Sequence, residues 1–183
     1  MFPVLRTPRL ELTSIERKDR NALFELFRDP KVVEYYDLGP LRDVSAADQL
    51  ITLFQARFDS TSGIRWAIRK AGCDALIGTV GFNAWSSKMH HGTIGYDLTR
   101  SAWGNGYATE AVEAVVHCAF SGDLACGPLH RIQADTVVGN VASERVLEKC
   151  GFREEGIRRD AIRIQGSYRD MKCFGLINSP KQP

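Results

Sequence analysis

The sequence predicts a single mixed α/β (α+β) domain, with a mostly antiparallel central sheet flanked by helices. Its 183 residues match the usual length of one domain. An apolar share of 44% and a charged share of 25% are typical of a folded globular protein. Runs with the two-residue period of strands alternate with runs at helical spacing, and no repeat or linker separates them. We therefore expect one domain over residues 1–177 and a tail over 178–183.

The first third of the chain is predicted to hold one strand and two helices. Residues 9–15 alternate apolar and polar side chains, as a half-buried strand does. Residues 19–28 place their large apolar side chains on one helical face, and Pro30 ends this helix because the residue before a proline avoids the α conformation. Residues 45–58 begin with a capping-box-like sequence and form the second helix.

The middle of the chain is predicted to be a three-stranded antiparallel meander followed by a long helix. Residues 65–70, 75–82 and 92–98 form the strands, with short turns between them. From residue 107 to 120, apolar residues recur three and four positions apart, which indicates a helix packed against the sheet.

The last third is predicted to add three strands and one helix. Residues 130–138 form a strand, and residues 140–150 form a short helix that ends at Gly151, where a left-handed conformation is common. Residues 152–164 and 167–177 then form two strands joined by a tight turn.

Composition argues against several classes of protein. The five cysteines form no C-x-x-C pair and the four histidines no H-x-x-x-H spacing, so neither a disulfide framework nor a metal site is predicted. The 24 basic and 22 acidic residues are interleaved, which gives no reason to expect nucleic acid or a membrane as a partner. No secretory signal and no run of about 18 apolar residues is present, so we expect a cytoplasmic protein.

The most informative segment is Gly104-Asn105-Gly106, between the strand that ends at Leu98 and the helix that begins near Tyr107. Two glycines let the backbone turn tightly and approach a ligand, while the free N–H groups at a helix start favour an anion. The segment predicts a phosphate site, with a purely structural glycine turn as the alternative. The G-x-G-x-x-G dinucleotide fingerprint fails, and no P-loop string occurs.

Several separated motifs surround this turn. They are Trp103–Ala111 (WGNGYATEA), Asn140–Ser143 (NVAS) and Leu147–Phe152 (LEKCGF). In this order they closely resemble the motifs of the GNAT N-acetyltransferase superfamily. Arg6–Leu10 (RTPRL) and Gly166–Asp170 (GSYRD) are similar, more narrowly, to the branch that acetylates the N-termini of ribosomal proteins. The resemblance spans nearly the whole chain.

The resemblance implies a GNAT fold whose central sheet splays open between its fourth and fifth strands and holds acetyl-CoA there, without a metal. Leu98 and Thr99 would offer main-chain hydrogen bonds to the pantetheine arm. Ser101 stands where the family's loop often has Gln or Arg, so this side-chain contact is in doubt. The coenzyme's diphosphate would rest on the main-chain amides of the loop before the long helix, namely Trp103, Gly104, Asn105, Gly106, Tyr107 and Ala108.

The resemblance also implies residues near the thioester. Asn140 and Ser143 would lie beside it, and Ser143 would protonate the leaving thiolate. Asn140 is equally suited to cap the helix that follows it. Glu155 matches a glutamate proposed as the base in the terminal-amine branch, and its alternative is a solvated carboxylate paired with Arg153 or Arg158.

We expect transfer by direct attack of an amine on the thioester in a ternary complex. A free α-amine has a pKa of about 7.7 to 8.0 and a lysine of about 10.4, so the α-amine of a protein or peptide, ribosomal proteins included, is the preferred acceptor. The alternatives are a small amine, such as an amino sugar or polyamine, and a non-catalytic module that binds acetyl-CoA. Tyr168 is a reserve acid, or else a packed strand aromatic.

The loops over residues 35–43 and 86–92 are expected to shape the acceptor site, and neither carries a motif that names the acceptor. The sequence leaves the oligomeric state open, a homodimer included. Basic side chains on the last two strands would steer an acidic acceptor or ribosomal surface, or would simply form an exposed hairpin laced with ion pairs. These side chains are Arg153, Arg158, Arg159, Arg163, Arg169 and Lys172.

Overall fold

A computed structural model describes residues 1–37 and 39–178. Within them lie eight strands, four α-helices and two short 3-10 helices, and the predicted tail beyond residue 178 lies outside the described part. No helix in the described part is long and apolar enough to cross a membrane. In chain order the elements are β1 (Leu5–Arg6), β2 (Leu10–Ser14), η1 (Arg17–Asp19), α1 (Arg20–Arg28), α2 (Val44–Asp59), β3 (Ile64–Lys70), β4 (Leu76–Ser86), β5 (His91–Leu98), η2 (Arg100–Ala102), α3 (Tyr107–Ser121), β6 (Arg131–Val137), α4 (Val141–Lys149), β7 (Arg153–Ile164) and β8 (Ser167–Ile177).

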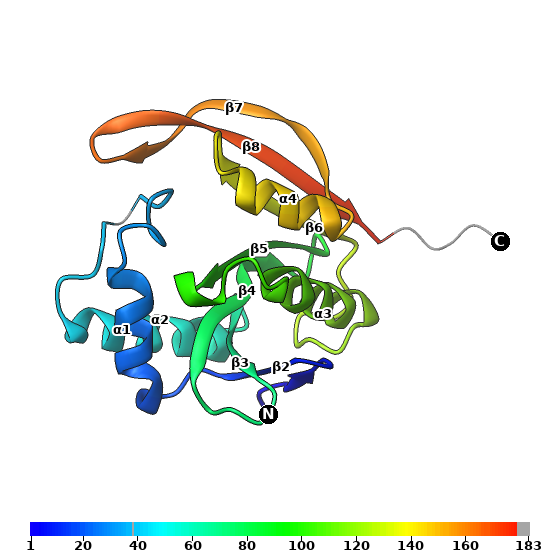
Figure 1. Ribbon diagram of the computed structural model, residues 1–183. Coiled ribbons are helices and arrows are strands. Elements are labelled where there is room, and N and C mark those ends of the chain that lie inside the picture. The colour runs from blue at the N-terminus through cyan, green and yellow to red at the C-terminus, as the bar shows by residue number, and fades with distance from the viewer. Residues whose placement is uncertain (38, 179–183) are drawn as a thin grey trace.

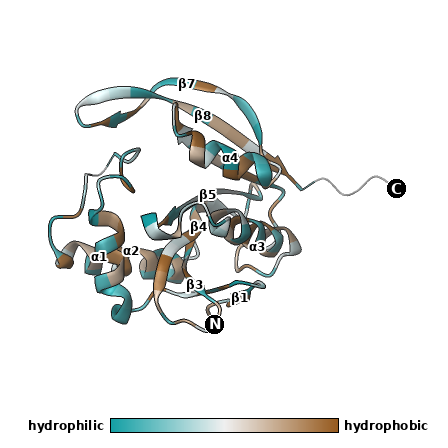
Figure 2. Cartoon of the chain, in the orientation of Figure 1, coloured by the Kyte–Doolittle hydropathy of each residue, from teal (hydrophilic) through white to brown (hydrophobic). Residues whose placement is uncertain are grey.

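The strands form one sheet in the order β1-β2-β3-β4-β5-β6-β8-β7. Every neighbouring pair is antiparallel except β5 and β6, so the mixed, mostly antiparallel sheet is confirmed (Figure 1). The edge strand β7 is exposed along most of its length and shows largely hydrophilic colours in Figure 2. The strand β1 was not predicted, because two residues are too few to show a period.

The helices cover the two faces of the sheet in pairs. Trp66 and Ile68 of β3 pack in one apolar cluster with α3 and α4, whereas Ala67 between them packs in a second cluster with α1 and α2. Since neighbouring residues of a strand point to opposite faces, the two helix pairs lie on opposite sides of the sheet. Because the loop over 35–43, which is expected to shape the acceptor site, joins α1 to α2, we call this side of the sheet the acceptor face.

The sheet opens between β5 and β6. These two strands pair only from His91 with Arg131 to Thr93 with Gln133, and their remaining residues form no ladder with each other. The expected splay between the fourth and fifth strands is therefore present; with β1 counted, these strands are β5 and β6. The gap lies beside the first turn of α3 and the start of α4.

Local signals placed most helix ends correctly. The helix α2 begins one residue earlier than expected because Asp43, rather than Ser45, is its N-cap and accepts hydrogen bonds from the amides of Ser45 and Ala46. Asn140 caps α4 as foreseen, and its side-chain oxygen accepts from the Ser143 amide at 3.3 Å. The hairpin of β7 and β8 has the predicted extent to within one residue.

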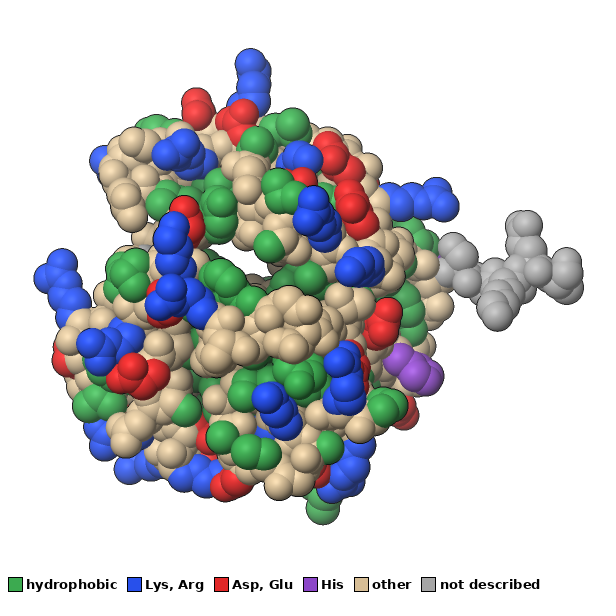
Figure 3. All heavy atoms as spheres, in the orientation of Figure 1, with side chains coloured by type: hydrophobic (Ala, Val, Ile, Leu, Met, Phe, Trp, Pro, Cys, Tyr) green, Lys and Arg blue, Asp and Glu red, His purple; other side chains and the backbone are tan. Residues whose placement is uncertain are grey.

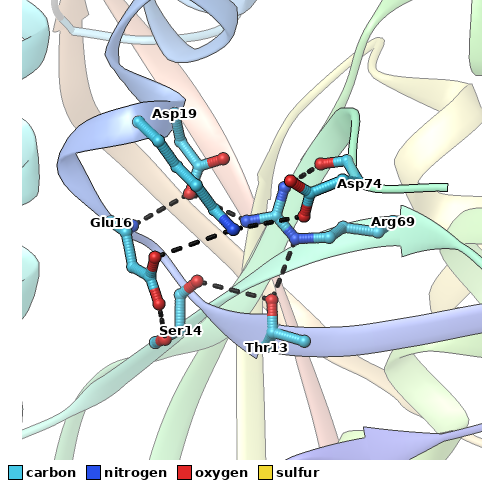
Figure 4. A network of polar contacts seen from close by, with 7 residues as sticks. Thr13, Ser14, Glu16, Asp19, Arg69 and Asp74 are labelled. Atoms are coloured by element: carbon cyan, nitrogen blue, oxygen red, sulfur yellow. Dashed lines mark hydrogen bonds and ion pairs between the residues drawn. The ribbon is translucent and has the colours of Figure 1, made fainter.

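A buried ion pair fixes the connection between β2 and α1 (Figure 4). The Arg69 guanidinium lies 2.8 Å from the Asp19 carboxylate, and both side chains are about 95% buried. Arg69 also donates to the Thr13 hydroxyl at 2.9 Å and to the carbonyl of Asp74. The Asp19 carboxylate accepts in turn from the Glu16 amide at 2.9 Å. Buried charges are tolerated because each has a partner and further hydrogen bonds.

Candidate active site

Residues 103–108, which we call the phosphate loop, lead from η2 into α3. Gly104 (φ 75°) and Gly106 (φ 77°) adopt the left-handed conformation. Any residue with a Cβ atom would be about 1 to 2 kcal/mol less stable in this conformation, so glycine is favoured at both positions. Gly106 is the N-cap of the 15-residue helix α3, so the first amides of this helix have no carbonyl partner within it. A loop of this kind fits the diphosphate of a coenzyme.

The amides of the phosphate loop are not all free. The Trp103 amide donates to the Arg100 carbonyl at 3.1 Å and is engaged within the turn. The amides of residues 104–108 remain as the expected donors. The Asn105 side chain donates to the carbonyls of Ala102 and Trp103, at 3.3 and 2.9 Å, and so holds the shape of the loop.

Main-chain groups of β5 point into the gap. The Thr99 amide donates to the Ile77 carbonyl at 2.9 Å, so the main chain of Leu98 points away from β4 and toward the gap. By the same alternation the main chain of Tyr96 faces the gap too. The main chain of Leu98 therefore faces the gap, and its carbonyl accepts from the Trp103 indole at 2.9 Å. The amide of Thr99 is engaged within the sheet.

Ser143 lies across the gap from Tyr96. The two hydroxyl oxygens are 2.7 Å apart, and the Tyr96 hydroxyl also donates to the Ser143 carbonyl at 3.0 Å. Burial raises the pKa of Tyr96, so the phenol stays protonated. The structure thus brings together Asn140, Ser143 and Tyr96. Tyr96 was not predicted, because it is an ordinary strand residue in the sequence until its partner on α4 is known.

Glu155 lies at a bulge of β7 and is held by Arg131 at the start of β6. Both carboxylate oxygens contact the guanidinium, one of them at 2.8 Å. This pairing holds the pKa of Glu155 below its ordinary value. A Cβ atom at Gly175 would come within 2.2 Å of the carboxylate, so the pair needs a glycine beneath it. Glu155 is thus an exposed, ion-paired carboxylate, as its alternative expected, but its partner is Arg131 rather than Arg153 or Arg158.

The structure does not bring Glu155 near Ser143. Arg131 pairs with His91 where β5 and β6 are still joined, and Tyr96 lies five residues further along β5, about 16 Å at strand spacing. Tyr168, the reserve acid, is 63% exposed on the hairpin, so the packed-aromatic alternative is wrong as well.

A buried polar cluster, also missed, occupies the acceptor face of β5. The Asp97 carboxylate accepts from Arg65, from the Thr79 hydroxyl at 2.9 Å and from the hydroxyl of Tyr36. Burial raises the pKa of Asp97. Arg65 also donates to the Gly95 carbonyl at 3.1 Å. The cluster fastens the loop between α1 and α2 to the sheet through Tyr36.

A pocket of about 520 Å³ lies between this loop and the turn of the β7–β8 hairpin. Figure 3 shows the hollow between the part of the molecule formed by the hairpin and α4 and the part that carries α1 and α2. The expected loop over 35–43 lines the pocket, whereas the loop over 86–92 does not. The lining residues are Pro30, Val33, Tyr36, Asp37, Gly39, Pro40, Arg163, Gln165 and Gly166.

The fold, with its gap beside a glycine-rich helix start, is that of an acyl-coenzyme A transferase, and comparison with known proteins agrees. Residues 9–153 match the family model described as the acetyltransferase (GNAT) domain. An uncharacterized N-acetyltransferase of Bacillus subtilis, YoaA, is 37% identical over 177 residues, which are 97% of this chain and 98% of that protein. The chain therefore belongs to the GNAT acetyltransferase family, and it is an acetyl-CoA-dependent N-acetyltransferase.

Two solved structures show the same fold with different acceptors. One is an acetyltransferase of Salmonella typhimurium that modifies the N-terminal serine of ribosomal protein L7/L12; it has a TM-score of 0.84 and 21% identity and covers 97% of this chain and 100% of its own. The other is a spermidine N-acetyltransferase of Vibrio cholerae in complex with CoA and spermine, with a TM-score of 0.79, 22% identity and coverage of 93% and 96%. At this identity both establish the fold alone.

Proposed function

We propose that this enzyme acetylates the α-amino group of a protein or peptide, with a ribosomal protein as the candidate acceptor. The observation that carries the proposal is the charge balance of the acceptor face. Alternate residues of β6 point to the same side of the sheet, and on one side these are Arg131, Gln133 and Asp135. The Gln133 side chain donates to Thr93 of β5, so Thr93 lies on that side too. Asp97 follows Thr93 by four residues and therefore points to the same side of β5. On this side of β5, β6 and β7 lie the carboxylates of Asp97, Asp135 and Glu155.

Each of these carboxylates contacts an arginine. Asp97 pairs with Arg65, Asp135 with Arg158, and Glu155 with Arg131. The pocket lining likewise contains one acidic residue, Asp37, and one basic residue, Arg163. A polyamine carries several ammonium groups and needs carboxylates whose charge is not already compensated. A peptide N-terminus brings a single amine, so the described acceptor face favours the peptide.

The basic hairpin supports the same choice. Arg158 and Lys172 have acidic partners. Among the described residues, no ion pair within 4.0 Å is found for the other basic side chains of the hairpin, which are Arg153, Arg159, Arg163 and Arg169. Of these, Arg163 lines the pocket and Arg169 pairs with Ile162 of β7 near the hairpin turn. The positive charge at this end of the hairpin would steer an acidic protein surface toward the pocket.

The chemistry requires an uncharged amine and a proton for the leaving thiolate. At pH 7.5 about a third of an α-amine is uncharged, against about one in a thousand of a lysine amine. The amine nitrogen attacks the thioester carbon, the C–S bond breaks, and the amine loses a proton. Ser143, hydrogen-bonded to Tyr96, is the proposed donor of a proton to the thiolate.

Glu155 remains the proposed base, acting through water. Its carboxylate lies on the acceptor face but is paired with Arg131, so it acts on the amine only through a chain of water molecules. The loop from Gly104 to Ala108 and the main chain of Leu98 are proposed to hold acetyl-CoA, with Asn140 supporting Ser143. A Glu155→Gln variant tests the base: turnover equal to that of the wild type rejects it.

The experiment is a thiol-release assay with acetyl-CoA and four acceptors in parallel. They are a serine-initiated peptide with the sequence of a ribosomal N-terminus, the same peptide with a blocked N-terminus and one internal lysine, spermidine, and an aminoglycoside. We expect release with the first peptide only. Activity on spermidine or the aminoglycoside alone contradicts the proposal, and binding of CoA without release on any acceptor identifies a non-catalytic module.

A further inference from the structure

Arg9 joins the N-terminal segment to the first turn of α3. Its side chain makes two contacts of 2.6 Å with the Glu110 carboxylate, and its main-chain amide donates to the other carboxylate oxygen at 3.0 Å. The Thr7 hydroxyl donates to that same oxygen at 2.6 Å. Glu110 is 85% buried at its side chain, and its carboxylate is held by four donors from one short segment, two of which belong to the Arg9 guanidinium. The fixed carboxylate in turn fixes the position of this guanidinium.

The same guanidinium also reaches the phosphate loop. Arg9 donates to the Asn105 carbonyl at 2.9 Å, and its central carbon lies 4.9 Å from the centre of the Tyr107 ring. A Cβ atom at Gly106 would lie 3.4 Å from the guanidinium. Arg9 thus contacts Asn105 and Tyr107 of the phosphate loop, although 96 positions in the chain separate Arg9 from Asn105.

This contact sets the direction of an amide. A trans peptide is planar, so the carbonyl of Asn105 and the N–H of Gly106 point in opposite directions. With the carbonyl turned toward Arg9, the Gly106 N–H is turned away from Arg9. In a loop with two left-handed glycines, this peptide would otherwise be free to adopt other orientations, because glycine restricts the backbone least.

We infer that Arg9 is a positioning residue for acetyl-CoA: by holding the Asn105 carbonyl, it presets the Gly106 amide to donate to the coenzyme's diphosphate. The inference rests on the proposed role of the phosphate loop. It also gives a function to Arg9 of the RTPRL motif, whose resemblance to the family carries no role for this arginine. Arg9 acts on the ligand through the loop, since its own charge is paired with Glu110.

The test compares Arg9→Gln with Arg6→Gln. Arg6 lies in the same segment and pairs with Glu11 on the surface, so its substitution is the matched control. Calorimetry measures the affinity for CoA, and turnover is measured with acetyl-CoA and with S-acetyl-N-acetylcysteamine, a thioester that lacks the diphosphate. For Arg9→Gln we expect CoA affinity and the kcat/KM of acetyl-CoA to fall about tenfold, the effect of one charge-assisted hydrogen bond.

With the truncated thioester, the kcat/KM of Arg9→Gln should equal that of the wild type. The kcat/KM of Arg6→Gln should equal the wild-type value with both thioesters. Arg9→Lys keeps the charge but loses the planar fork, so it should restore little of the affinity. Equal CoA affinity in wild type and Arg9→Gln overturns the inference, as does an equal loss with both thioesters, which indicates a general structural role.

Two further measurements separate the explanations. Glu110→Gln keeps the shape of the Arg9 partner but removes its charge, so it should weaken CoA binding less than Arg9→Gln does. If Arg9→Gln does not fold, Glu110→Gln serves as the test, and an unchanged CoA affinity in that variant overturns the inference. Hydrogen exchange at residues 103–108 should be faster in ligand-free Arg9→Gln than in the wild type. If the wild type itself binds no CoA, the proposed role of the phosphate loop fails, independently of Arg9.

Discussion

Removing the Tyr96 hydroxyl tests the proton donor at the gap. Tyr96→Phe deletes one oxygen atom that makes two hydrogen bonds to Ser143, on the hydroxyl and on the carbonyl. Each such bond contributes about 0.5 to 1.5 kcal/mol to stability, so the free energy of unfolding should fall by about 1 to 3 kcal/mol. The phenyl ring keeps its packing, and the fold should be retained.

The kinetic effect should be larger than the effect on folding. If Ser143 with Tyr96 supplies a proton to the leaving thiolate, kcat for thiol release should fall by about 100-fold in Ser143→Ala and by at least about tenfold in Tyr96→Phe, with the KM for acetyl-CoA little changed. The double variant should be no slower than Ser143→Ala, because both changes remove the same donor. An undiminished kcat in both Tyr96→Phe and Ser143→Ala would refute this reasoning.

Two further predictions concern buried and titrating charges. Asp19→Ala leaves Arg69 charged and unpaired in the core and should lower the free energy of unfolding by about 3 to 5 kcal/mol, whereas Lys18→Ala on the surface should cost less than about 1 kcal/mol; urea denaturation compares the two. Burial opposes the ionisation of Glu110, but hydrogen bonds from Thr7 and Arg9 outweigh it and hold its pKa below 4.5. A carboxyl group whose pKa is lowered in the folded state stabilises the fold above pH 4.5, and this stabilisation is lost as the pH falls through the pKa of the folded state. The Tm advantage of wild type over Glu110→Gln should therefore shrink between pH 5 and 3. A constant Tm difference over that range contradicts this assignment.

The sequence by itself determined the local features of this protein. The glycine turn before α3 was predictable because left-handed φ angles and a helix start depend on a few neighbouring residues. The same holds for Asn140 as the cap of α4 and for the β7–β8 hairpin, whose alternation and turn are contained in one stretch. The family motifs placed the gap between β5 and β6, since each motif is also a short local pattern.

Only the tertiary structure decided which side chains meet. Tyr96 faces Ser143 because of the register of β5 and the course of α4, 47 residues later. Glu155 meets Arg131, rather than an arginine on its own strand, because a bulge and Gly175 turn it toward β6. Arg9 reaches the phosphate loop only because β2 runs beside α3. Contacts between distant segments depend on strand order and register, which the pattern of any one segment leaves undetermined.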